Sequence, residues 1–142
     1  MFVTPAAQIG AIIMTLICVF AAWAGGRAQK VVAAIVFVAW VGSAAIQDRS
    51  YKVPQYATLW LDIGLAIVFL VLALRWRRKW LTGLATFQVL TMASHFAMIL
   101  DPRIWPKASI TAYMVWSYMV LVCLLWGGVA GLIDRRRTAS AP

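Results

Sequence analysis

The sequence is poor in the residues that build metal, haem and disulfide sites. It has one histidine, His95, two cysteines, Cys18 and Cys123, and no glutamate among its four acidic residues. Two cysteines far apart in the chain exclude a disulfide framework, and a single histidine leaves a zinc site short of ligands. A haem would have to take His95 as an axial ligand, with a methionine such as Met114 opposite it. The plainer expectation is that the protein carries no metal and no cofactor.

Charged residues are scarce as well. Only 12% of the residues are charged and 64% are hydrophobic, against about 25% and about 45–50% in a typical soluble domain. A water-soluble chain of 142 residues could not bury so much apolar surface. A soluble helical protein with a very apolar core is the alternative, but the apolar residues form long blocks without an amphipathic period. The composition therefore predicts an integral membrane protein.

Proline, which interrupts helices, is absent from five long apolar blocks. Each block approaches the ~20 residues that a helix needs to cross a ~30 Å hydrocarbon layer. Backbone groups in lipid must find partners within their own segment, so we expect each block to be helical. The sequence thus predicts an all-α membrane protein with a single transmembrane domain over residues 1–142. This bundle of about five helices, joined by short loops, has expected spans at about 6–25, 31–47, 56–74, 80–100 and 108–133.

The basic residues divide unequally between the two sides of such a bundle. If the N-terminus lies outside, nine of the thirteen lysines and arginines fall on the inner side. This division follows the positive-inside rule and predicts the N-terminus outside and the C-terminus inside. The net charge of +9 then has a topological explanation, and we expect membrane lipids rather than nucleic acid as partners. The nine inner residues are Arg27, Lys30, Arg75, Arg77, Arg78, Lys79, Arg135, Arg136 and Arg137.

The first block could also be a secretory signal peptide, because Ala22 and Ala24 flank Trp23 as in a small-x-small cleavage site. A signal peptide carries its positive charge before the apolar stretch. Here Arg27 and Lys30 follow the stretch instead. We therefore expect the first block to remain as a transmembrane helix.

Asp62 is the only charged residue well inside an expected span. A charge in the hydrocarbon costs a few kcal/mol on lenient insertion scales, so it normally faces the bundle and finds a partner. His95 is the natural partner, and Tyr113 belongs to the next span. Asp62 lies six residues from Tyr56, His95 six residues from Asp101 and Tyr113 six residues from Lys107, or about 9 Å along a helix. The sequence thus predicts that Asp62, His95 and Tyr113 lie at one depth.

Further polar residues extend this level. Gln88, Thr91 and His95 fall on one helix face, as do Tyr113 and Ser117. The first interpretation is structural, with interhelical contacts worth about 0.6 kcal/mol on average. The second is a proton-handling or ligand-binding site, because histidine titrates near neutral pH. No serine or cysteine is marked as a nucleophile, so we predict no catalytic residue. The candidate buried polar cluster is Asp62, His95, Tyr113, Gln88, Thr91 and Ser117.

Gly127 and Gly131 form a GxxxG pattern in the fifth block. Small residues at this spacing let two helix backbones approach closely. The pattern also occurs by chance, so it favours helix packing or self-association only weakly.

The pattern from Trp60 and Asp62 through His95 to the aromatic fifth block resembles small uncharacterised polytopic membrane proteins of bacterial inner membranes. The resemblance implies a multi-pass protein of the bacterial cytoplasmic membrane and carries no activity. Small size and short loops favour an accessory or assembly subunit of a larger inner-membrane complex, with other subunits or a second copy as partners. The alternatives are a small oligomeric proton-coupled transporter and a membrane-embedded enzyme acting on a lipid or quinone.

Overall fold

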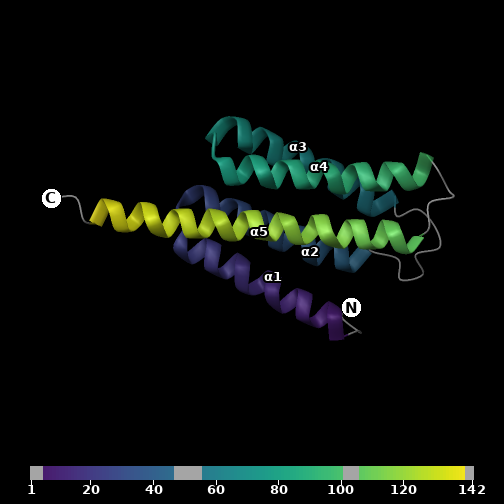
Figure 1. Ribbon diagram of the computed structural model, residues 1–142, viewed down its shortest axis with the longest axis horizontal. Helices are drawn as coiled ribbons and strands as arrows, with labels where there is room; N and C mark the ends of the chain where they lie inside the picture. Colours follow the sequence, from purple (N-terminus) through teal and green to yellow (C-terminus); the bar gives the residue numbers. More distant parts are fainter. Residues whose placement is uncertain (1–4, 47–55, 101–105, 140–142) are drawn as a thin grey trace.

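The computed structural model describes residues 5–46, 56–100 and 106–139. These residues form helices and no strand, which confirms the prediction of an all-helical bundle for this part of the chain. The helices are α1 (Pro5–Ala24), α2 (Arg27–Ile46), α3 (Tyr56–Trp76), α4 (Lys79–Leu100) and α5 (Pro106–Ala139) (Figure 1).

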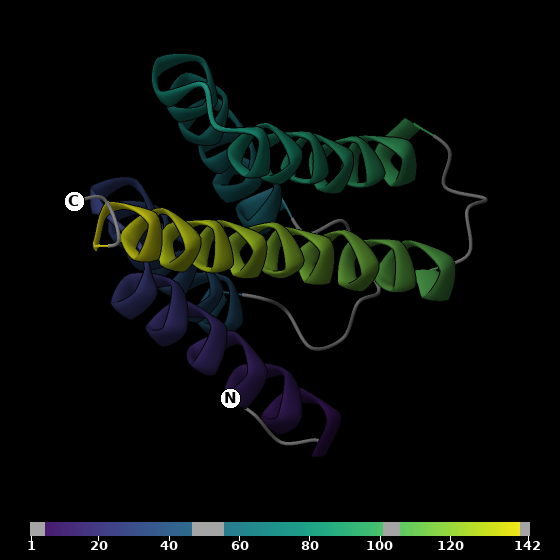
Figure 2. The same ribbon diagram turned by 60° about the vertical axis from the view of Figure 1, so that its left-hand side comes forward.

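The fifth helix is the centre of the bundle. In two views α5 lies between α1 on one side and the α3–α4 pair on the other (Figures 1 and 2). It packs most extensively on α4 and also contacts α1 and α2, while each helix contacts the next along the chain. The α1–α2 turn, the α3–α4 turn and the end of α5 therefore share one end of the bundle.

The core is built from aliphatic and aromatic side chains of all five helices. Its largest fully buried members come from α2 to α5, and Met14 and Cys18 extend it to α1. Large apolar side chains also lie on the outer surface; Trp60 and Leu74 of α3, for example, are 71% and 69% exposed. The buried members from α2 to α5 are Phe69, Leu81, Leu84, Leu121, Leu124, Val32 and Val36.

Three helices among the described residues are long and apolar enough to cross a membrane. They are α2, α3 and the Thr111–Thr138 part of α5, and α1 contributes a shorter apolar stretch at Gln8–Ala24. Apolar side chains on both the inside and the outside of a helix are typical of a bundle surrounded by lipid. The structure is therefore that of a helical bundle with membrane-spanning character.

Two of the expected boundaries were wrong. Residues Arg27–Lys30 were expected to be a loop, but they form the first turn of α2, and Gly25 and Gly26 alone make the connection. The amide of Gly26 donates to Gln29 Oε1 at 3.1 Å, which caps the start of the helix. The fifth helix was expected to end near residue 133, but it continues to Ala139. Its 34 residues reach about 51 Å, well beyond the ~30 Å apolar layer, because arginine is a good helix former outside lipid.

The glycines of α5 lie where other helices come closest. A Cβ atom on Gly131 would lie 2.8 Å from the Cα atom of Gly25, at the end of α1. A Cβ atom on Gly127 would lie 2.7 Å from the indole of Trp80 on α4. Gly127 and Gly131 therefore pack within the chain, Gly127 against α4 and Gly131 against the end of α1.

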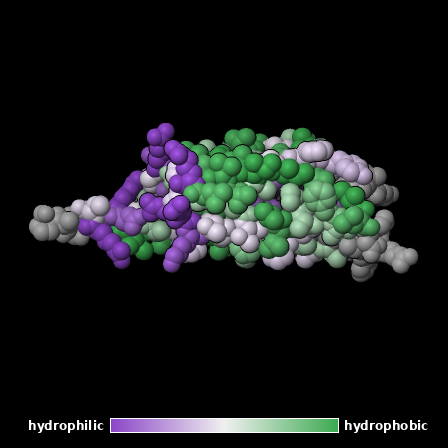
Figure 3. All heavy atoms as spheres, turned by 90° about the horizontal axis from the view of Figure 1, so that it is seen from above, coloured by the Kyte–Doolittle hydropathy of each residue, from purple (hydrophilic) through white to green (hydrophobic). Residues whose placement is uncertain are grey.

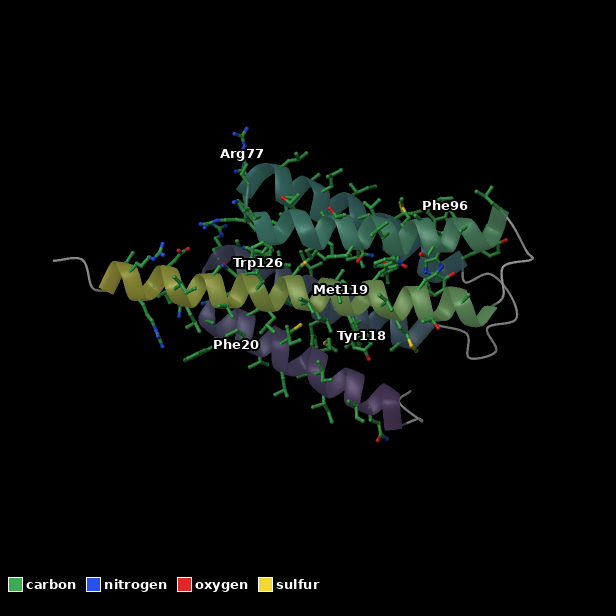
Figure 4. All side chains as sticks on the ribbon, viewed as in Figure 1. Phe20, Arg77, Phe96, Tyr118, Met119 and Trp126 are labelled. Atoms are coloured by element: carbon green, nitrogen blue, oxygen red, sulfur yellow. The ribbon has the colours of Figure 1, made fainter. Side chains whose placement is uncertain are left out.

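The α3–α4 turn contains a strained residue. Arg77 has a φ of 48°, in the left-handed region that usually holds glycine after a helix. Its amide donates to the carbonyl of Ala73 at 2.9 Å, which closes the last turn of α3. Its side chain points away from the bundle (Figure 4).

Candidate functional site

A buried carboxylate joins α3 to α4. Asp62 is 8% exposed, and Gln88 Nε2 donates a hydrogen bond to its Oδ1 atom at 2.8 Å. His95 Nε2 lies 3.0 Å from the other oxygen, Oδ2, and makes a salt bridge when it is protonated. Both oxygens of the carboxylate therefore have a partner on α4.

The spacing of Gln88 and His95 explains why both reach one carboxylate. They are seven residues apart, or two turns, so they lie on the same side of α4. Thr91 lies between them and is also buried, but its hydroxyl donates to the carbonyl of Phe87 in its own helix at 3.0 Å. Thr91 therefore shares the face of the cluster without a hydrogen bond to Asp62.

The fifth helix contributes Tyr113. Its ring stacks on the imidazole of His95, with centroids 4.1 Å apart and an angle of 14° between the planes. A stacked ring restricts rotation of the imidazole and so keeps Nε2 directed at the carboxylate. The structure thus brings four of the six candidate residues together from three helices: Asp62, Gln88, His95 and Tyr113.

Ser117 is not part of this group. It lies half-buried on α5, one turn beyond Tyr113. A different pair links the two helices nearby: Trp116 Nε1 donates to Ser94 Oγ at 3.2 Å, and Ser94 donates to the carbonyl of Leu90 at 2.9 Å. This second polar link between α4 and α5 was missed by the sequence analysis, because neither residue carries a charge that marks it.

Thr58 was also missed. It lies one helical turn before Asp62 on α3 and is 7% exposed. Among the described residues, its hydroxyl is the one fully buried side-chain oxygen or nitrogen without a hydrogen-bond partner. An unsatisfied buried hydroxyl is costly, so a water molecule or a polar group of a ligand would be stabilised there. The spacing of four residues from Asp62 was the signal that could have revealed it.

The described residues contain no group of three or more side chains suited to a metal ion. No known protein family, curated protein or solved structure matches this chain. The chemistry open to the site follows from its own groups. A carboxylate and an imidazole at hydrogen-bonding distance can share or pass a proton, and they can equally hold two helices in register.

Proposed function

We propose that this protein is a five-span protein of a bacterial inner membrane and serves as an accessory or assembly subunit of a larger membrane complex. All five helices cross the bilayer in this proposal, with the N-terminus outside and the C-terminus inside. Its partners are membrane lipids and other membrane protein subunits, or a second copy of the chain.

The distribution of charge supports the orientation. The basic residues of the first turn of α2, the α3–α4 turn and the end of α5 share one end of the bundle. Figure 3 shows hydrophilic side chains gathered at one end and apolar side chains over the adjoining part. Such an end suits the cytoplasmic side, where anionic lipids lie and where the positive-inside rule places lysine and arginine.

The contacts of Asp62 are the observation that carries the subunit proposal. Both of its oxygens are occupied by donors from α4, and Tyr113 covers the imidazole from α5. Arranged in this way, the one described charge deep in the bundle holds three helices together. With its polar interior engaged in helix contacts, the protein presents mainly apolar helix faces to its surroundings.

One such face belongs to α1, which packs on α5 and α2 with one side only. Ile9, Ile12, Leu16, Val19 and Trp23 lie on its other side and are 58–69% exposed. A ridge of this kind can pack against a helix of another subunit, since packing drives helix association in lipid.

Native mass spectrometry of gently solubilised, tagged protein tests the subunit proposal. We expect a complex that contains at least one other membrane polypeptide in fixed stoichiometry. Replacement of Leu16 on the exposed ridge by Ala should weaken this complex, whereas replacement of Leu70, exposed on α3, should leave it intact. A homogeneous monomer, unchanged by crosslinking in the native membrane, would contradict the proposal. A homo-oligomer would contradict the subunit role and leave a second copy of the chain as the protein partner.

A proton-coupled transporter is the second candidate, and the Thr58 hydroxyl favours it. An unsatisfied hydroxyl one turn from an ionisable pair offers a hydrogen-bonding group to a water molecule, which a proton path requires. The same group of residues could instead bind the head of a lipid or quinone in a membrane-embedded enzyme. If the protein is a transporter or an enzyme, the Asp62→Asn variant should fold and assemble normally but lose proton flux or turnover. If the protein is an accessory subunit, the same variant should keep its biological effect.

A further inference from the structure

A polar hollow lies at the basic end of the bundle. It has a volume of about 210 Å³ and is open on one side, which is room for about seven water molecules at ~30 Å³ each. Residues of the α1–α2 connection, the α3–α4 turn and the last turns of α5 line it. Three parts of the chain that are far apart in sequence thus meet around one cavity.

The floor of the hollow is preorganised. Gln29 is 7% exposed, and its amide accepts from the Gly26 amide and donates to the carbonyl of Gly127 at 3.2 Å. Arg135 donates to the carbonyls of Trp23 and Gly25 at 3.0 and 2.7 Å. These contacts fix the guanidinium beside the hollow and neutralise the negative end of the α1 dipole there.

The second cation of the hollow is less tightly engaged. Arg78 lies 3.6 Å from the carboxylate of Asp134, and both side chains are more than half exposed. An exposed ion pair of this length contributes little, so an incoming anion can compete for Arg78. The start of α2, whose dipole favours anions, adjoins the hollow at Gly26.

We propose that this hollow binds the phosphodiester head group of an anionic phospholipid, held by Arg78 and Arg135. Basic pockets between helices on the cytoplasmic side are suited to such head groups. The inference rests on the proposed function only in placing this end of the bundle at the inner leaflet. Bound there, the lipid ties the α3–α4 turn to the ends of α1 and α5.

Lipid retention by the full chain in neutral detergent tests the site. Native mass spectrometry compares dioleoylphosphatidylglycerol with dioleoylphosphatidylcholine at equal concentration, and we expect preferential retention of the former. Arg78→Gln should weaken this retention roughly fivefold, the factor associated with one arginine at an anionic surface. Arg75→Gln removes the same charge from the same end of the bundle, outside the hollow, and should change it little.

Asp134→Asn gives the opposite test, because it removes the competing carboxylate from Arg78. Retention of phosphatidylglycerol relative to phosphatidylcholine should rise by a similar factor, and misfolding would not produce a gain that is specific to one head group. Equal effects of Arg78→Gln and Arg75→Gln, or no gain in Asp134→Asn, would overturn the proposal. Full displacement of the lipid by millimolar inorganic phosphate would also overturn it, since the ligand would then be a free anion. Because the measurement is made in detergent, an inverted orientation in cells would refute the proposed topology without touching this result.

Discussion

The contact between Asp62 and His95 leads to the most specific prediction. Replacing Asp62 by Ala removes two interhelical contacts, one to Gln88 at 2.8 Å and one to His95 at 3.0 Å. Polar contacts between membrane helices are worth about 0.6 kcal/mol each on average and at most about 1.7. We therefore expect Asp62→Ala to lower the free energy of unfolding by roughly 1–3 kcal/mol.

Asp62→Asn should cost much less than Asp62→Ala. The amide oxygen can still accept from Gln88, and the amide nitrogen can donate to neutral His95, so both contacts survive with the charge removed. His95→Ala should cost more than Asp62→Asn, because it leaves the buried carboxylate of Asp62 with Gln88 as its one partner.

A double-mutant cycle isolates the contact. Asp62→Ala, His95→Ala and the double variant are compared with wild type by reversible unfolding in detergent, and we expect the double variant to cost about 0.6–1.7 kcal/mol less than the sum of the singles. Thr91→Ala is the matched control, since Thr91 is buried on the same face of α4 but bonds to its own backbone. If Asp62 couples to His95 no more strongly than to Thr91, the assignment of the pair as the link between α3 and α4 is wrong.

Two further changes test the packing of the helices. Gly131→Ala should destabilise the bundle by about 1–3 kcal/mol, because its Cβ would lie 2.8 Å from the backbone of Gly25. Gly64→Ala, with nothing within 4 Å, should not lower the melting temperature in detergent, and equal losses at the two sites would contradict the close approach of α5 and α1. Arg77→Gly should raise the free energy of unfolding by about 1 kcal/mol by relieving a left-handed backbone conformation. A loss of stability in that variant would mean that the arginine side chain holds the turn.

The sequence predicted most of the helices because apolar blocks and polar breaks are strong signals. α1, α3 and α4 lie within two residues of the expected spans at each end. The end of α5 was harder to predict, because hydropathy shows which residues favour lipid and not where a helix ends. Arg135 belongs to the helix and at the same time caps the end of α1, a contact between distant parts of the chain that composition does not reveal.

The polar site was predictable where one residue was conspicuous. Asp62 is a lone carboxylate in an apolar block and His95 a lone imidazole, so their equal depth could be inferred by counting residues. The role of Gln29 could not be inferred from the sequence, because Gln29 lies in a segment that was expected to be a polar loop. It becomes a buried contact only after the α1–α2 turn folds beneath α5.

The orientation of the basic end can be measured directly by labelling single cysteines in intact cells. The background carries Cys18→Ala and Cys123→Ala, both at buried positions. In that background we expect Arg77→Cys to react with a membrane-impermeant maleimide only after permeabilisation, because the proposed topology places the α3–α4 turn inside. Ser50→Cys, in the segment between the second and third spans, should react in intact cells. Labelling of position 77 from outside, or of both positions from the same side, would contradict the five-span arrangement with the N-terminus outside.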